Sequence, residues 1–170
     1  MSIVQNFPFF SIILAMFSGI VSSVLSGKKA RNLSIAMILA VFVLSLSTLA
    51  FCWGTGESYT YWMGHFPAPW GNEIRAGILE GVTASLFSLV MVLSVIGGMG
   101  HTEQDVEAAK QNLFYIMVDL MLSSLLALIY TNDLFTAYVF VEINTIAGCG
   151  MIMIRQKGRS LSSAIRYMIL

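Results

Sequence analysis

Five long apolar stretches limit what this chain can fold into. A helix needs about 20 mainly apolar residues to cross the roughly 30 Å hydrocarbon core of a bilayer. The stretches cover residues 7–25, 33–53, 77–99, 113–130 and 134–154, and a shorter one at 161–170 is typical of the start of a sixth helix. The sequence therefore predicts an all-α, polytopic transmembrane helix bundle, with residues 1–170 forming a single membrane domain.

The charge content agrees with a membrane protein. Only 11% of the residues are charged and 57% are hydrophobic, whereas soluble domains carry about 25% charged residues. The net charge is zero, which gives no indication of nucleic-acid binding. Both cysteines and both histidines stand alone in the sequence, so we expect no metal site, no cofactor and no catalytic site in this chain.

Basic residues indicate the orientation, because cytoplasmic loops are enriched in lysine and arginine. Arg75 lies in the long loop at 54–76, on one side of the predicted bundle. Seven basic residues lie on the other side: Lys28, Lys29, Arg31, Lys110, Arg155, Lys157 and Arg159. We therefore expect a multi-pass protein of the cytoplasmic membrane, with its N-terminus and longest loop outside. His101, Glu103, Asp105 and Glu107 are interpreted as a solvated cytoplasmic loop.

Two acidic residues lie deep inside apolar stretches, away from their ends. Glu142 lies about 13 Å from the outer end of its predicted helix at 1.5 Å per residue, near mid-membrane. Asp119 lies at a similar or deeper level. Carboxylates at this depth are costly and are usually functional, so both are candidates for proton translocation. The alternative, strongest for Asp119, is a neutral packing residue that is fully hydrogen-bonded.

Other polar residues share the helical faces of these acids. Tyr138 and Thr145 lie on the stripe of Glu142 together with Cys149, while Tyr115 and Ser123 lie on the stripe of Asp119. We expect a paired stripe of this kind to line a hydrated interior, and Tyr138 and Thr145 join the two acids as candidates for proton translocation.

Three further residues have structural interpretations. Asp133 directly precedes the fifth stretch and is expected to cap that helix. Glu80 lies near Arg75 at the outer end of the third stretch, where an interfacial role is favoured. Gly77 and Gly81 have the spacing typical of close helix packing.

Three segments resemble one family of membrane proteins. Residues 130–143 (YTNDLFTAYVFVEI) are similar to the start of the fifth helix in antiporter-like subunits. Residues 62–71 (WMGHFPAPWG) and 164–170 (AIRYMIL) are similar to that family's outer loop before helix three and to its sixth helix. These subunits occur in respiratory complex I, Mrp-type cation/proton antiporters and membrane-bound hydrogenases.

The resemblance implies a role for Glu142, which matches the glutamate that pairs with a lysine on helix seven in the family. None of the five complete stretches contains a lysine. Arg166 stands where the family usually has lysine, and Glu80 where it often has aspartate.

We therefore expect the N-terminal piece of a split antiporter-like subunit in a multisubunit complex. Another chain would supply the remaining helices and the lysine partner of Glu142. The complex would translocate protons, or sodium ions and protons, as an ion-translocating oxidoreductase or an Mrp-type antiporter. One alternative is a structural membrane subunit that conducts nothing, and another is a small transporter that works as a homo-oligomer.

Overall fold

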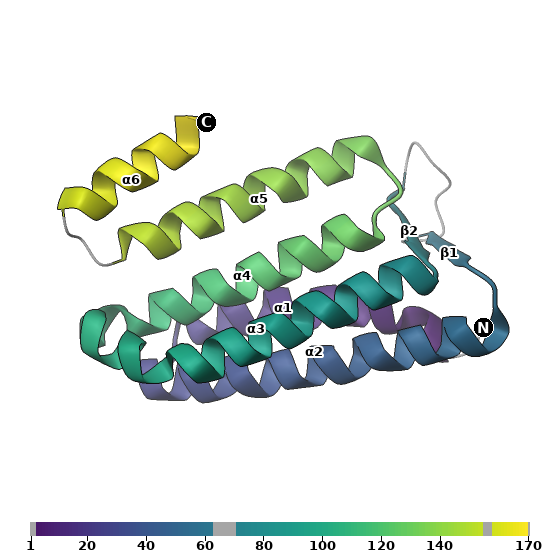
Figure 1. Ribbon diagram of the computed structural model, residues 1–170, viewed down its shortest axis with the longest axis horizontal. Helices are drawn as coiled ribbons and strands as arrows, with labels where there is room; N and C mark the ends of the chain where they lie inside the picture. Colours follow the sequence, from purple (N-terminus) through teal and green to yellow (C-terminus); the bar gives the residue numbers. More distant parts are fainter. Residues whose placement is uncertain (1–2, 63–70, 155–157, 170) are drawn as a thin grey trace.

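The computed structural model describes residues 3–62, 71–154 and 158–169 (Figure 1). A 3-10 turn at Ile3–Asn6 leads into the first helix, and a second at Ala108–Lys110 precedes the fourth. The α-helices are α1 (Phe7–Ser22), α2 (Gly27–Thr55), α3 (Ile78–Asp105), α4 (Gln111–Tyr130), α5 (Leu134–Met153) and α6 (Gly158–Ile169). In these ranges five helices are long and apolar enough to cross a membrane, which confirms the predicted polytopic bundle.

The first four α-helices form the body of the bundle. Helices α1, α2 and α4 contact one another, and α3 packs against α2 and α4. Ile38, Val41, Leu122 and Leu126 fill the centre of this core and are almost completely buried. Helix α5 packs on α4, and α6 packs on α5 (Figure 1). Large apolar side chains such as Phe17, Val43 and Leu93 are exposed on the outer faces, as expected for contact with lipid.

A small sheet that the sequence analysis did not predict closes the end of the bundle expected to face outward. Strand β1 (Tyr59–Trp62) pairs antiparallel with β2 (Glu73–Ala76), with Tyr59 opposite Ala76. Strand β2 also bonds to the α4–α5 connection, because the backbone N–H of Asn132 donates to the Glu73 carbonyl at 2.9 Å. The sheet therefore fastens the start of α5 to the rest of the bundle.

At the opposite end, two helices are longer than predicted. Helix α2 begins at Gly27 rather than at residue 33, and α3 continues to Asp105 rather than ending at residue 99. His101, Glu103 and Asp105 therefore belong to a helix, and their interpretation as a loop is wrong. A salt bridge between Arg31 of α2 and Glu103 of α3 joins the two extensions.

The described basic residues of the expected cytoplasmic side do gather at this end. Lys28 and Lys29 lie in the first turn of α2, and Lys110 lies just before α4. Arg155 and Lys157 lie outside the described residues. The orientation in the membrane stays a prediction that this distribution supports.

Candidate functional site

Glu142 lies on the face of α5 that points away from the rest of the chain, and its side chain is exposed. Tyr138, one turn earlier, is 63% exposed, and its hydroxyl adjoins the Glu142 carboxyl group. Thr145 is half-buried, and its hydroxyl donates to the Val141 carbonyl at 2.9 Å. The pair Tyr138–Glu142 is therefore accessible to a neighbouring helix, whereas the Thr145 hydroxyl already has a partner in its own helix.

The surroundings of Glu142 on this face are apolar. Leu134, Phe135 and Ile146 are strongly exposed on α5, with Leu134 87% exposed. The ion pairs between described residues are Arg31–Glu103, Arg75–Glu80 and Lys110–Glu107, so Glu142 has no basic partner in this part of the chain. A carboxylate facing hydrocarbon costs at least a few kcal/mol, so this face is suited to contact with protein or water rather than lipid alone.

Asp119 is completely buried where α1, α2 and α4 meet. The hydroxyl of Ser18 on α1 donates to Asp119 Oδ2 at 2.8 Å, and that of Ser34 on α2 donates to Oδ1 at 2.5 Å. Gly19 of α1 packs beside Asp119, and a Cβ at Gly19 would lie in ordinary contact, 3.6 Å from the Asp119 Cβ. Asp119 therefore joins three helices through two hydrogen bonds.

Among the described residues, the two polar stripes do not face each other. Tyr115, Asp119 and Ser123 are all buried in the core, where the Ser123 hydroxyl donates to the Ile12 carbonyl at 3.2 Å. Tyr138 and Glu142 instead face away from the bundle. The reason is that α1 and α2 cover one side of α4 while α5 packs on another.

Asp133 occupies the capping position predicted for it. Its Oδ2 accepts hydrogen bonds from the Thr136 backbone N–H at 2.8 Å and from the Thr136 hydroxyl at 2.6 Å. These bonds hold the pKa of Asp133 below its ordinary value. Asp133 thus fixes the first turn of the helix that carries Glu142.

The other two structural candidates, Glu80 and Arg166, form no described contact with Glu142. The Glu80 Oε1 lies 4.0 Å from the Arg75 Nε at the end of α3 beside the sheet, and the interfacial role of Glu80 stays a prediction. Arg166 is exposed in the last turn of α6.

Sequence reasoning missed Ser18 and Ser34, because single serines in apolar stretches give no signal for their partners. Across the described residues no cluster of three histidines, cysteines or acids could hold a metal ion.

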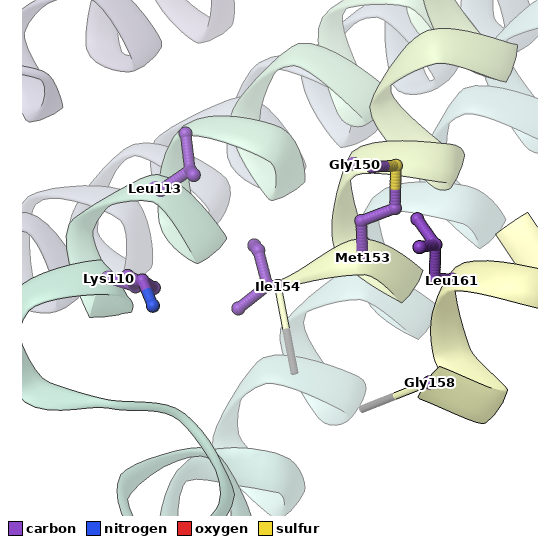
Figure 2. A pocket seen from close by; sticks show the side chains of 7 residues that line it. All are labelled: Lys110, Leu113, Gly150, Met153, Ile154, Gly158 and Leu161. Carbon is purple, nitrogen blue, oxygen red and sulfur yellow. The ribbon is translucent and has the colours of Figure 1, made fainter. Parts of the chain in front are cut away.

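A separate cavity of about 530 Å³ lies at the inner end, between the start of α4 and the α5–α6 pair (Figure 2). Its wall is apolar except for one lysine. The lining residues are Lys110, Leu113, Gly150, Met153, Ile154, Gly158 and Leu161. Neither Glu142 nor Asp119 lines it, so it is not part of the candidate site.

Comparison with proteins of known sequence gives relatives over nearly the whole chain, although no family model matches. NADH-quinone oxidoreductase subunit N of Desulforudis audaxviator is 29% identical, over 97% of this chain and 33% of the relative. A Staphylococcus epidermidis protein named as antiporter subunit mnhD2 is 25% identical, over 83% of this chain and 28% of the relative. The chain thus spans about a third of the length of these relatives.

Solved structures contain the same fold. A chain of the membrane-bound sulfane sulfur reductase, an archaeal respiratory membrane complex, matches with a TM-score of 0.82 and 16% identity. A chain of the Mrp complex from Dietzia sp. DQ12-45-1b matches with a TM-score of 0.84 and 15% identity. The matches cover 100% and 99% of this chain, and 34% and 32% of those chains.

Proposed function

We propose that this chain is an antiporter-like membrane subunit that takes part in proton translocation within a multisubunit complex of the cytoplasmic membrane. Relatives that carry the names of an NADH-quinone oxidoreductase subunit and an antiporter subunit support this proposal. So does the similarity of the fold to chains of two membrane complexes. The redox or antiport chemistry would reside in other subunits.

Glu142 is the residue we assign to proton handling. The observation that carries the proposal is its position: the carboxyl group lies halfway along an exposed, otherwise apolar face of α5, next to Tyr138. In apolar surroundings a carboxyl group retains its proton, and an approaching cation favours the release of that proton. Approach of a cation would therefore favour release of the proton from Glu142, and departure of the cation would favour its uptake.

The cation would come from outside these 170 residues. Each described ion pair of the chain involves other acids, and the resemblance to the family implies a lysine. We propose that a further helix, in a continuation of this subunit or in a neighbouring one, covers the Tyr138–Glu142 face and brings the lysine to it. Asp119 is not required, because its two serine partners already satisfy it within helix packing.

Replacement of Glu142 in the assembled complex tests the proposal. We expect Glu142→Gln to reduce proton translocation at least about tenfold, because glutamine keeps the shape but cannot exchange a proton. Translocation is measured with a pH-sensitive dye in membrane vesicles, and assembly is checked on native gels. Glu57→Gln is the matched control, because Glu57 is an exposed acid outside the membrane-spanning helices.

The structural alternative makes the opposite prediction. If the subunit only supports a complex and conducts nothing, Glu142→Gln assembles normally and translocates protons at the wild-type rate. That result would refute the assignment of Glu142.

A further inference from the structure

A second polar region lies in the core near the outer end, below the two-stranded sheet. Tyr130, in the last turn of α4, lies within electrostatic range of Tyr59 on β1, Cys52 on α2 and Glu80 on α3. Ser45 of α2 adjoins Tyr130 as well. Four elements thus bring five polar side chains to one place, although each of these residues is isolated in the sequence.

Three of the hydroxyl groups in this region lack hydrogen bonds. The Ser45 Oγ, the Tyr59 hydroxyl and the Tyr130 hydroxyl are buried and have no hydrogen-bond partner among the described residues. Ser45 and Tyr130 are each only 1% exposed. Their hydroxyls lie near each other but not in the geometry of a hydrogen bond. Buried polar groups nearly always have a partner, and an ordered water is the usual one where the protein provides none.

Glu80 is a partly exposed member of this region. The Glu80 side chain is 21% exposed, and its Oε1 is 4.0 Å from the Arg75 Nε. This distance is longer than a direct hydrogen bond, so the carboxylate retains capacity to accept from water. Its Oε2 lies 2.8 Å from the position that a Cβ on Gly77 would occupy, which shows that the glycine leaves room for this side chain.

We propose that this region, which we call the outer hydroxyl site (Ser45, Cys52, Tyr59, Glu80 and Tyr130), binds a small cluster of ordered water molecules. The hydroxyls of Ser45, Tyr59 and Tyr130 hold the cluster, and Glu80 connects it to the outer surface. One buried water makes about three hydrogen bonds, so one or two waters satisfy the three hydroxyls. The site lies in the four-helix body, whereas Glu142 lies on the outward face of α5, so the proposal is independent of the function assigned to Glu142.

The two cysteines of the chain provide an internal comparison for a test. Cys52 belongs to the outer hydroxyl site and is 0% exposed, whereas Cys149 is 4% exposed and lies between α5 and α6. X-ray radiolysis of the assembled complex in membranes produces hydroxyl radicals from bound water, which oxidise adjacent side chains. We expect Cys52 to be oxidised at least about fivefold faster than Cys149, since a bound water lies beside it. Equal or slower oxidation of Cys52 would overturn the proposal.

Removal of the hydroxyls gives a second readout. The double substitution Ser45→Ala with Tyr130→Phe should reduce the oxidation rate of Cys52 to that of Cys149. Tyr130→Phe alone should also lower the melting temperature, because it removes a hydrogen bond to water. In a dry site the same substitution removes an unpaired polar group and raises the melting temperature, which would contradict the proposal. Tyr167→Phe on α6 is the control for loss of a tyrosine hydroxyl, because Tyr167 is exposed and has no part in either site.

Discussion

At the scale of single residues, the two intramembrane acids differ in their surroundings. Asp119 is enclosed by three helices and accepts hydrogen bonds from Ser18 and Ser34, whereas Glu142 is exposed and lies next to Tyr138. Sequence position alone treats them as equivalent, since both are carboxyl groups in apolar stretches. Their different packing suits them to different roles. The surroundings of Asp119 fit a hydrogen-bonded packing residue, whereas Glu142 remains the candidate for proton translocation.

This division predicts different outcomes for two substitutions of Asp119. Asp119→Ala leaves the buried Ser18 and Ser34 hydroxyls without their partner and should cost about 1–3 kcal/mol of stability. Asp119→Asn retains an acceptor and should preserve most of that stability. Thermal unfolding of the complex in detergent measures both. If Asp119→Asn instead abolishes proton translocation in a stable complex, Asp119 carries protons and the packing role is insufficient.

A second prediction at this scale concerns the cap of α5. Hydrogen bonds from Thr136 lower the pKa of Asp133 in the folded state. Its contribution to stability is therefore complete above the pKa of the unfolded chain, and it is lost as the pH falls through the lower, folded value. We expect the wild type to lose stability below about pH 4, and Asp133→Ala to lack this part of the pH dependence. Identical pH profiles for thermal unfolding would contradict the capping role.

At the scale of elements, a single glycine sets the distance between α2 and α3. A Cβ at Gly81 would lie 3.0 Å from the Leu49 Cα and 3.2 Å from the Leu49 Cβ. The backbone of α2 cannot move aside cheaply, so Gly81→Leu should separate the helices and cost about 1–3 kcal/mol. Thermal unfolding in detergent measures this loss. Gly97→Ala on the same helix is the matched control, because a Cβ at Gly97 meets nothing within 4 Å and should be neutral or slightly stabilising.

The sequence predicts the elements better than it predicts their contacts. Apolar stretches of about 20 residues identify all five spanning helices, because the thickness of the bilayer imposes that length. The predictions fail where the chain leaves the hydrocarbon core, since α3 continues to Asp105 and the strands β1 and β2 are short and rich in polar and aromatic residues. The cap at Asp133 is predictable because its partner Thr136 is three residues away.

The contacts of Asp119 follow a different rule. Ser18 and Ser34 lie 101 and 85 residues from Asp119 in the chain, and no local pattern connects them to it. The outward direction of Glu142 depends on which side of α4 receives α5, which also lies beyond local sequence patterns. The identity of the candidate residues is thus readable from the sequence, whereas their exposure and partners require the fold.

At the scale of the whole molecule, the distribution of charge predicts the orientation. Glu57 lies at the end that carries the sheet, and Glu107 lies beside the basic end; both are exposed. The native cysteines are buried, so cysteines introduced by Glu57→Cys and Glu107→Cys can be labelled selectively. A membrane-impermeant maleimide added to intact cells should label the first variant and should label the second only after permeabilisation. The reverse pattern would show that the N-terminus faces the cytoplasm.

The attachment of β2 to the α4–α5 connection restrains the first residues of α5, so that a tilt of the helix would turn about this end. The Asn132–Glu73 backbone hydrogen bond holds the start of α5. Over the rest of its length, α5 packs mainly against α4 and α6 among the described elements. Glu142 is eight residues beyond the first residue of a 20-residue helix, so a swing that displaces the inner tip would displace Glu142 by a little under half as much. A displacement of the far end of α5 would thus move the Glu142 carboxyl group by a smaller distance, because the helix turns about its attached end.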